Sequence, residues 1–390
     1  MSSVVNLEKM QLDKVLMPIP WFAPAFKAGG PVQSVVNMLK HCNEFMDFYI
    51  VTPDSDIDHT KLQISKTDAW VEFDENTHVN YVSKQNRFSK LIKIFKSQKY
   101  PVAFMTGIYS FSFTLLPLIF VRSSRKILSV RGMLHPPALA QKRIKKKIYL
   151  AFLKPILRLK KVEFHATDDT EKQHILAVMG NDVKIWVVPN IPRIIGVKPI
   201  SKQSGCLKLL TVALIGPMKN HLKVLLALTE CKGEIEYDIC GPVYWPDYWE
   251  ECLKVIQTLP QNIKVRYHGP VPPQELIHYY QESHIFICPS QSENYGHALF
   301  ESFSAGRPVI TSYNTPWNNL SENNIGLNVS VQNKELKMAI DFFSEMNQDT
   351  YNSWSQQASD FAIKNAMISS TQKKYQQMFS NEKNVDSFKL

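Results

Sequence analysis

The chain has 390 residues, of which 44% are hydrophobic and 21% charged, and its net charge is +10 at pH 7. A length above roughly 250 residues predicts two domains, and the composition excludes a disordered chain. The six cysteines form no C-x-x-C pair and no Cys/His metal spacing, which predicts a reducing compartment and no structural zinc.

The sequence carries no obvious export or membrane-spanning signal. The first residues lack a basic region followed by a long apolar run, so we expect no secretory signal. The most apolar stretch, 111–121, contains Pro117 and falls well short of the roughly 20 residues that a membrane-spanning helix needs. We therefore expect a cytoplasmic protein.

Basic charge is concentrated in the first half. Residues 1–195 hold 28 Lys and Arg against 16 Asp and Glu, whereas residues 196–390 hold 17 against 19. Such an excess indicates an anionic partner. Because no nucleic-acid motif with interleaved aromatics is present, we expect a membrane surface and no nucleic acid.

Short apolar runs alternate with helical segments along the chain, which predicts α/β domains with parallel sheets covered on both faces. The first series of strands is expected at 15–19, 48–51, 102–105, 127–130 and 185–188. The second series is expected at 209–212, 237–240, 265–267, 285–288 and 309–311. The fold class is therefore two doubly wound Rossmann-like domains, expected to face a central cleft.

The boundary between the two series is expected near 190–205, where prolines and polar residues interrupt the pattern. This places an N-terminal domain at 1–195 and a C-terminal domain at 196–370. A C-terminal helix and tail follow at 371–390, and packing back on the N-terminal domain is one option for them.

The first candidate site is the segment 26–34, with Gly29 and Gly30 after the first strand and Pro31 in the first turn of a helix. Paired glycines allow backbone to approach a phosphate or sugar closely, although a plain turn would also account for them.

A second candidate follows a later strand of the first half. Arg131 is a candidate for donor phosphate or acceptor and His135 for acceptor, with simple turn chemistry as the alternative for both. His165 ends another strand and fits a satisfied core histidine better than a ligand.

The next segment is basic and then apolar at helical spacing. A membrane-binding surface would use its basic residues Lys142, Arg143, Lys145, Lys146 and Lys147. A solvated helix with one core face explains the same pattern equally well.

The first loop of the second half, 213–220, contains Lys219. The position of this lysine alone would also fit a merely exposed side chain.

The strongest signal is the segment 288–310. A buried strand ends at Pro289, a polar loop carries Glu293, and a helix opens after Gly296 and stops at Gly306. Amides at a helix N-terminus can hold a diphosphate, and nearby carboxylates can accept from sugar hydroxyls. Eight residues of helix rise about 12 Å, so the carboxylates are too far apart for a glycosidase pair.

Glu293 and Glu301, with seven residues between them, resemble the E-x7-E signature of the retaining family 4 glycosyltransferases of GT-B architecture. The flanking Pro289-Ser290, Gly296 and 305–309 match that family too. The resemblance covers the second half well and the first half more loosely.

The resemblance implies that the N-terminal domain is acceptor-binding and the C-terminal domain is nucleotide-sugar-binding. It also implies a place for Lys219 beside the donor diphosphate, where it would stabilise the leaving group. Glu293 would lie at the transferred sugar, and Glu301 would bind the donor ribose. The remaining donor contacts would come from Gly29, Gly30, Lys219, Asn294, Tyr295, Gly296 and the base-reading loop 269–275 with Val271. The family's Arg beside the diphosphate is replaced by Leu214, so either Arg131 or Arg307 substitutes or diphosphate binding is weaker.

The implied activity is metal-independent, retaining hexosyl transfer from a nucleotide-diphosphate sugar to a lipid-linked or oligosaccharide acceptor, in lipopolysaccharide or capsule synthesis. Its catalytic residues would be Glu293, Lys219 and Arg131, with no cofactor and no metal. The pairs Asp54/Asp56 and Asp168/Asp169 resemble a metal-binding D-x-D only superficially. The alternatives are another GT-B enzyme, such as a nucleotide-sugar epimerase, and a non-catalytic binder of sugar nucleotides or membrane surfaces.

Overall fold

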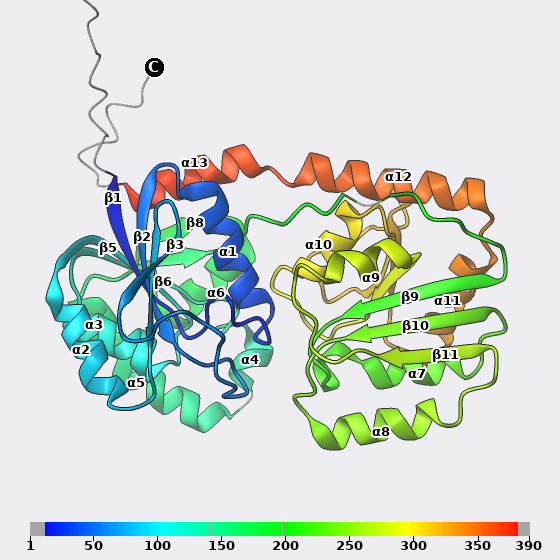
Figure 1. The fold of residues 1–390 in the computed structure, drawn as a ribbon, viewed down its shortest axis with the longest axis horizontal. Coiled ribbons are helices and arrows are strands. Elements are labelled where there is room, and N and C mark those ends of the chain that lie inside the picture. Colours follow the sequence, from blue (N-terminus) through cyan, green and yellow to red (C-terminus); the bar gives the residue numbers. More distant parts are fainter. Residues whose placement is uncertain (1–11, 141, 197, 381–390) are drawn as a thin grey trace, which may run out of the picture. The chain divides into compact units, whose positions relative to one another are not determined.

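The computed structural model describes residues 12–140, 142–196 and 198–380, which form two compact units (Figure 1). The first unit contains the residues up to Ala25, Val35–Asn190 and the residues from Ser369 onward. The second unit contains Phe26–Ser34 and Ile191–Ile368. The expected domains were contiguous, whereas in the structure the glycine segment groups with the second unit and the C-terminal helix groups with the first.

The first unit is built on an eight-stranded sheet in the order β3-β4-β2-β1-β5-β6-β7-β8. All neighbouring strands are parallel except β3 and β4, which pair antiparallel. The strands are β1 (Asp13–Pro18), β2 (Met46–Pro53), β3 (Trp70–Asp74), β4 (Thr77–Val82), β5 (Lys99–Thr106), β6 (Arg122–Ser129), β7 (Glu163–Ala166) and β8 (Ile185–Val187). Strands β1 and β5 are apolar and buried because helices cover both faces of a parallel sheet.

The helices of the first unit connect these strands. They are α1 (Gly30–Cys42), α2 (Arg87–Ser97), the π-helix η1 (Phe111–Leu115), α3 (Leu116–Phe120), α4 (Pro136–Ala140), α5 (Arg143–Leu159) and α6 (Asp169–Met179). Helix α6 begins where the Asp168 side chain accepts a hydrogen bond from the Glu171 amide at 2.7 Å, an N-cap that satisfies one of the first free N–H groups.

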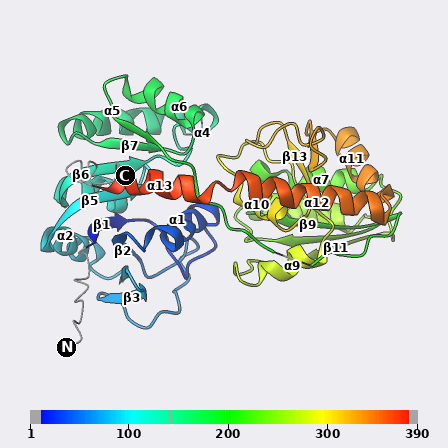
Figure 2. The ribbon, with the colours of Figure 1, turned by 90° about the horizontal axis from the view of Figure 1, so that it is seen from above.

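The C-terminal helix α13 (Ile368–Phe379) packs within the first unit (Figure 2). The Phe379 ring lies 5.9 Å from that of Phe48 and 5.3 Å from that of Phe104, measured between centroids. Tyr375 packs against His165 at 5.9 Å. Residues 381–390 of the expected tail lie outside the described residues.

The second unit is built on a six-stranded, fully parallel sheet in the order β11-β10-β9-β12-β13-β14. Its strands are β9 (Cys206–Val212), β10 (Glu234–Cys240), β11 (Ile263–Tyr267), β12 (Ile285–Cys288), β13 (Val309–Ser312) and β14 (Gly326–Val329). Its helices are the 3₁₀ turn η2 (Pro217–Lys219), α7 (His221–Leu228), α8 (Pro246–Ile256), α9 (Leu276–Glu282), α10 (His297–Ser304), α11 (Asn333–Glu345) and α12 (Gln348–Asn365).

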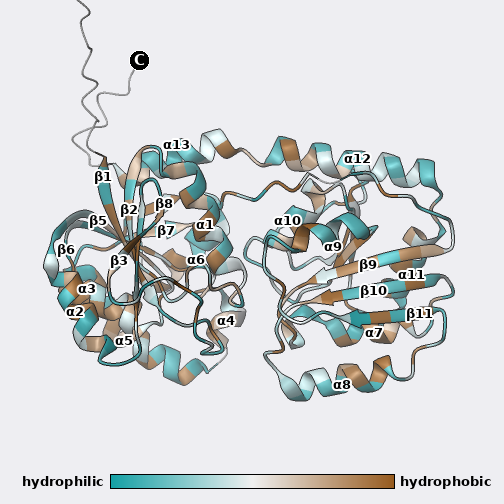
Figure 3. Ribbon diagram, viewed as in Figure 1, coloured by the Kyte–Doolittle hydropathy of each residue, from teal (hydrophilic) through white to brown (hydrophobic). Residues whose placement is uncertain are grey.

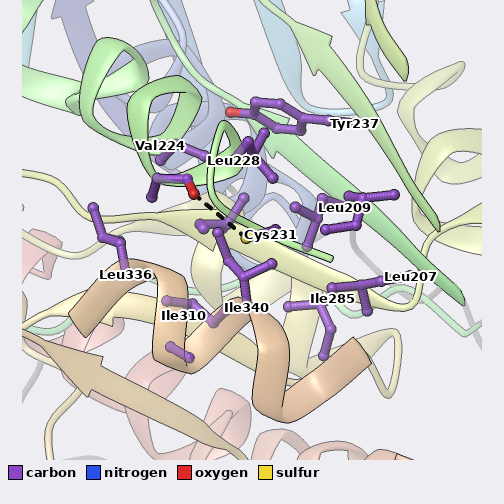
Figure 4. Packing of buried hydrophobic residues seen from close by; sticks show 14 of the residues in the cluster. Leu207, Leu209, Val224, Leu228, Cys231, Tyr237, Ile285, Ile310, Leu336 and Ile340 are labelled. Atoms are coloured by element: carbon purple, nitrogen blue, oxygen red, sulfur yellow. Dashed lines mark hydrogen bonds between the residues drawn. The ribbon is translucent and has the colours of Figure 1, made fainter. Parts of the chain in front are cut away.

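The core of the second unit lies between its sheet and helices α7 and α11 (Figure 4). Leu209 and Ile285 from the sheet meet Leu228 and Ile340 from the helices, all fully buried. The Cys231 thiol donates to the Ala227 carbonyl at 3.4 Å, so even this weak donor is satisfied (Figure 4). Hydrophobic and hydrophilic residues alternate along α8 and α12, as expected for helices with one face on a core (Figure 3).

The prediction of two doubly wound α/β domains is confirmed. Strands β3, β4 and β14 were not predicted, because β3 is largely exposed and β4 and β14 interleave polar with apolar residues. Within the described part of the chain, no helix has the length and apolar character needed to cross a membrane.

Candidate active site

The residues of the strongest sequence signal gather at one edge of the second sheet. Strands β9 and β12 are parallel neighbours, so their carboxyl ends open at the same edge. The loop 213–220 follows β9, and the loop 289–296 follows β12 and leads into α10. Two loops that are distant in sequence are thereby brought side by side.

Hydrogen bonds hold these two loops together. The Gln291 amide donates to the Met218 carbonyl at 2.8 Å, and the Ser290 hydroxyl donates to the same oxygen at 3.1 Å. The Asn220 side-chain amide donates to the Pro289 carbonyl at 2.7 Å. The backbone around the candidate catalytic residues is therefore fixed before any ligand binds.

Lys219 and Glu293 contact each other across the two loops. The Lys219 Nζ donates to Glu293 Oε1, and both side chains are largely buried. Burial lowers the pKa of the Lys219 ammonium, but Glu293 and Cys288 together raise it, and the net pKa lies above the usual lysine value. Lys219 is therefore charged at neutral pH, and two candidate catalytic residues form one ion pair.

Trp245 supports the turn that carries Lys219, and the sequence analysis missed it. A Cβ on Gly216 would lie 2.2 Å from Cε3 of the Trp245 ring, so only glycine fits beneath the indole. The Ile215 amide also donates to the Pro242 carbonyl at 2.9 Å, which joins this turn to the loop after β10. The Gly216-Pro217 pair was the one sequence feature that could have indicated this tight turn.

The start of α10 depends on Gly296. This residue has φ 76°, a left-handed conformation that favours glycine, and a Cβ there would approach the Leu299 side chain to 2.8 Å. The preceding Tyr295 carbonyl accepts from the Trp317 indole at 2.6 Å. Asn294, Tyr295 and Gly296 are thus held in the strand-to-helix connection that the sequence predicted.

Glu301 lies on the buried side of α10. Its Oε1 is 3.2 Å from Arg193 Nε, and its Oε2 is 3.3 Å from the Tyr280 hydroxyl. Burial raises the pKa of the Glu301 carboxyl, whereas Arg193 and Tyr280 lower it, and the net shift is upward. The Glu293 and Glu301 carboxylates therefore have separate cationic partners.

Arg193 was not identified from the sequence, because it lies in the proline-containing segment expected only to link the domains. Its Nη1 donates to the Pro273 carbonyl at 3.0 Å, within the expected base-reading loop. The nearby Ile195 amide donates to the Ser304 hydroxyl at 2.9 Å, which fixes the segment along α10. Val271 of the same loop packs its half-buried side chain on the hydrophobic cluster below.

The glycine segment 26–34 groups with this second unit. The Ser34 hydroxyl lies 2.7 Å from His297 Nε2, and a Cβ on Gly30 would lie 3.7 Å from His297 Cδ2. Gly29 has φ 68°, which a tight turn before α1 requires.

Comparison with known proteins identifies the family of this region. Residues 198–361, which contain Lys219, Glu293 and Glu301, match the family model of glycosyl transferases group 1. The similarity to that family covers this part of the chain. No curated protein matches the chain at a significant level.

Solved structures share the fold of nearly the whole chain at low sequence identity. HepE from Anabaena, solved with UDP and glucose, is 12% identical with a TM-score of 0.68, covering 94% of this chain and 99% of that one. Sucrose-phosphate synthase from Thermosynechococcus elongatus is 14% identical with a TM-score of 0.69, covering 95% and 99%. WaaG, a glycosyltransferase involved in lipopolysaccharide biosynthesis, is 12% identical with a TM-score of 0.64, covering 94% and 100%. The fold is that of the GT-B glycosyltransferases.

Arg131 and His135 belong to the first unit. Arg131 has φ 51°, and its guanidinium donates to the Asn190 side-chain oxygen. The His135 ring packs against that of His174 at 4.8 Å, and burial together with His174 lowers the pKa of His135. His135 is therefore mostly neutral at pH 7 and can both donate and accept a hydrogen bond.

His165 is a core histidine. Its two ring nitrogens lie 2.8 Å from the Ser129 hydroxyl and 2.8 Å from the Val188 carbonyl. Burial lowers the pKa of His165 to about 3, so the ring stays neutral. His165 is therefore a satisfied core histidine and not a ligand.

Arg307 does not replace the arginine missing at Leu214. Its guanidinium is buried and donates to the carbonyls of Tyr280 at 2.9 Å, Lys198 at 2.9 Å and Gln281 at 3.2 Å. The hypothesis that Arg307 binds the diphosphate is wrong, because three backbone acceptors already occupy this side chain.

The aspartate pairs of the first half have structural partners. Asp168 caps α6, and the Asp54 carboxylate lies 3.2 Å from Arg87 Nη2. Across residues 12–140, 142–196 and 198–380, no group of three His, Cys, Asp or Glu side chains is placed to hold a metal ion.

Helix α5 carries the predicted basic run and has two apolar faces. The core face consists of Leu150, Leu153 and Leu157. The exposed apolar residues are Ile144 (75% exposed), Ile148 (54%), Phe152 (74%) and Leu159 (81%). At 3.6 residues per turn these four lie within about 80° of each other and opposite the core face. We call these four residues the outer stripe.

Lys145 and Lys147 flank the outer stripe on its two sides, whereas Lys146 lies on the opposite side of the helix. Lys142, Arg143, Lys145 and Lys147 are exposed. The Lys146 ammonium donates to the Ala138 carbonyl and lies 5.2 Å from the centre of the Tyr109 ring. Burial, with a contribution from Lys142, lowers the pKa of Lys146. Lys146 therefore helps to hold α5 in place.

Proposed function

We propose that the protein is a retaining hexosyltransferase that uses a nucleotide-diphosphate sugar as donor. The observation that carries this proposal is the Lys219–Glu293 ion pair at the carboxyl ends of β9 and β12, with Glu301 on the helix that follows. A cation for a leaving diphosphate and a carboxylate for a sugar hydroxyl are both held within a family-matched glycosyltransferase domain. HepE, which shares the fold, was solved with UDP-glucose, which supports this donor class.

Donor binding is expected to divide the ion pair. The diphosphate carries more negative charge than one carboxylate, so it attracts the Lys219 ammonium and leaves Glu293 free to accept from hydroxyls of the transferred sugar. Glu301 would accept from the ribose, and the backbone around Val271 would contact the base. Gly29, Gly30 and the amides of Asn294, Tyr295 and Gly296 would complete the donor contacts.

The proposed reaction retains the anomeric configuration by front-face attack. The acceptor oxygen forms a bond to the anomeric carbon on the face from which the diphosphate leaves, through an oxocarbenium-like state. The bond between that carbon and the diphosphate oxygen breaks, and the acceptor proton passes to the leaving phosphate. Lys219 stabilises the charge that develops on this phosphate, so no metal ion or cofactor is needed.

For the acceptor we propose a lipid-linked or oligosaccharide glycan in surface polysaccharide synthesis. The involvement of WaaG in lipopolysaccharide biosynthesis supports this pathway class. Arg131 and His135 are the proposed acceptor residues of the first unit, with Arg131 also a candidate for donor phosphate. Both can donate hydrogen bonds to glycan hydroxyls or phosphates.

We further propose a cytoplasmic location at the inner face of the cell membrane, with α5 in contact with anionic lipid. Residues 142–161 contain nine basic residues and no acidic one, and Lys145 and Lys147 flank the outer stripe. Basic charge attracts anionic headgroups, and exposed Ile and Phe side chains can enter the boundary with the acyl chains. This arrangement would bring the enzyme to lipid-linked acceptors.

The first test is donor binding by saturation-transfer NMR and thermal shift with UDP-, GDP- and ADP-sugars. We expect wild type to select one donor and Glu301→Ala to lose it while remaining folded. Transfer to an acceptor then separates the proposal from an epimerase, which would convert the donor without an acceptor. If no nucleotide sugar binds at saturation, the donor assignment is wrong.

Leu214 favours one second candidate, a non-catalytic binder of sugar nucleotides. The resemblance predicts an arginine at this position, and Arg307 cannot replace it because carbonyl oxygens occupy its guanidinium. Binding of one donor with neither transfer nor hydrolysis would support this alternative. Transfer that is lost in Lys219→Ala would exclude it.

A further inference from the structure

Arg193 connects three parts of the proposed nucleotide site: the linking segment that carries it, the expected base-reading loop 269–275 and helix α10. Its Nε lies 3.2 Å from Glu301 Oε1, and its Nη1 donates to the Pro273 carbonyl at 3.0 Å. The segment that carries it is tied to α10 through Ile195 and Ser304. One guanidinium therefore spans the expected base-reading loop and the carboxylate expected to meet the ribose.

Glu301 needs such a partner because of where it lies. Its side chain is 6% exposed, and an isolated carboxylate in that environment takes up a proton instead of remaining charged. Within the described residues, the ionisable groups that act on it are Arg193 from the linking segment and Tyr280 from α9. The Tyr280 hydroxyl is also 3.1 Å from the Ala298 carbonyl, so its single proton is shared between two acceptors.

The charge on Glu301 decides what it can do for a ribose. An ionised carboxylate only accepts, and it can take hydrogen bonds from both the 2′- and 3′-hydroxyl groups. A protonated carboxyl becomes a donor on one oxygen and forms weaker, neutral hydrogen bonds. Ribose recognition by Glu301 therefore requires that the carboxyl remain ionised inside the protein.

We propose that Arg193 is a positioning residue that keeps Glu301 ionised and correctly oriented for the ribose hydroxyls of the donor. It acts through Glu301. The hydrogen bond from Arg193 to the Pro273 carbonyl holds the guanidinium beside the Glu301 carboxylate. This inference rests on the proposed function, since it requires Glu301 to bind a nucleotide ribose.

The test isolates the ribose contact by comparing two nucleotides. For a uridine donor, calorimetry would measure the affinity of UDP and of 2′,3′-dideoxy-UDP between pH 5.5 and 9. If the donor panel selects another base, the matching pair is used. The ratio of the two affinities reports the hydroxyl contacts, and a reduced folded fraction cancels in it. The variants are Arg193→Gln, Arg193→Lys and Glu301→Gln.

We expect wild type to prefer UDP by roughly tenfold or more at pH 7 to 9, as hydrogen bonds to a charged group would give. Removing the positive charge in Arg193→Gln raises the pKa of Glu301. The preference should therefore be lost near neutral pH and return as pH rises through that higher pKa. Arg193→Lys keeps the charge, so it should keep most of the preference at pH 7.

Three different results would each contradict one part of the proposal. An Arg193→Gln ratio that equals the wild-type ratio at every pH overturns the role of Arg193. A ratio that falls but does not recover at high pH overturns the charge mechanism. An unchanged ratio in Glu301→Gln shows instead that Glu301 does not bind the ribose, which contradicts the proposed function itself.

Discussion

The two units use charge in opposite ways. In the second unit, the charged residues of the proposed donor site lie in ion pairs, Lys219 with Glu293 and Arg193 with Glu301. In the first unit, α5 exposes a run of basic residues beside the outer stripe, and residues 142–161 contain no acidic residue to pair with them. The charges of the proposed donor site are neutralised by ion pairs within the protein. The basic residues of α5 remain available to the proposed external partner.

Solvent exposure explains this difference. The donor-site carboxylates are largely buried, and an unpaired buried charge would shift its pKa or destabilise the fold. Most of the α5 cations are exposed, so water solvates them and they remain available to the proposed anionic surface. An excess of basic residues in a sequence therefore indicates a binding surface only where these side chains have no acidic partner within the protein.

The largest effect should come from breaking the Lys219–Glu293 pair. Lys219→Ala removes the cation for the leaving phosphate, so we expect the transfer rate to fall by about 100-fold or more. The matched control is Lys223→Ala, an exposed lysine on neighbouring α7. Steady-state kinetics with the selected donor would measure both variants, with thermal unfolding as a check on folding. Equal activity in the two variants would show that the charge at 219 is not used.

The next effect concerns the outer stripe. The triple variant Ile144→Ser, Ile148→Ser and Phe152→Ser should weaken binding to phosphatidylglycerol-containing vesicles by on the order of 100-fold, at about 1 kcal/mol for each partly inserted side chain. The matched control is Ile363→Ser, which is 67% exposed on α12 of the second unit. Vesicle co-sedimentation would measure all variants.

Salt concentration separates the electrostatic and the hydrophobic components of the proposed membrane contact. Charge reversal at Lys145 and Lys147 should remove the salt-sensitive part of vesicle binding, because screening acts on exposed charges. The triple serine variant should keep the salt dependence and lose affinity at every salt concentration. If the triple variant binds like wild type, the outer stripe does not enter the membrane.

A smaller effect is expected at Glu301. Glu301→Gln keeps the shape but removes the charge opposite Arg193, so donor affinity should fall by roughly tenfold while the turnover of bound donor changes little. Initial rates over a range of donor concentrations would separate KM from kcat. A fall in kcat with unchanged KM would indicate that Glu301 acts on the reacting sugar instead.

Local patterns in the sequence were sufficient for most of the fold and for the centre of the site. The buried β-branched runs of β9 and β12 predicted the sheet edge, and the spacing from Glu293 to Gly306 predicted the loop and helix beyond it. Lys219 was identified through the family resemblance, which expects a lysine in the loop after the first strand of this domain. All of these features depend on residues that are close together in the chain.

The residues that the sequence did not reveal depend on distant contacts. Arg193 meets Glu301 only after the linking segment runs along α10, and Trp245 covers Gly216 only after β9 and β10 pair. In the same way, nothing local showed that Arg307 is surrounded by carbonyl oxygens, or that Lys146 packs against Tyr109. Charge and residue type alone could not separate these structural cations from the exposed ones.

The smallest expected effect tests how the turn at Gly216 supports Lys219. Gly216→Ala forces the Trp245 ring aside, because its Cβ would lie 2.2 Å from Cε3, and we expect KM for the donor to rise by roughly threefold to tenfold. Gly196→Ala is the control, since no atom lies within 4 Å of the Cβ it would add. In a Trp245→Ala background the clash is absent, so Gly216→Ala should then have almost no further effect. Additive losses in the double variant would mean that the glycine serves the donor directly, by letting it approach the backbone, and not by making room for the indole.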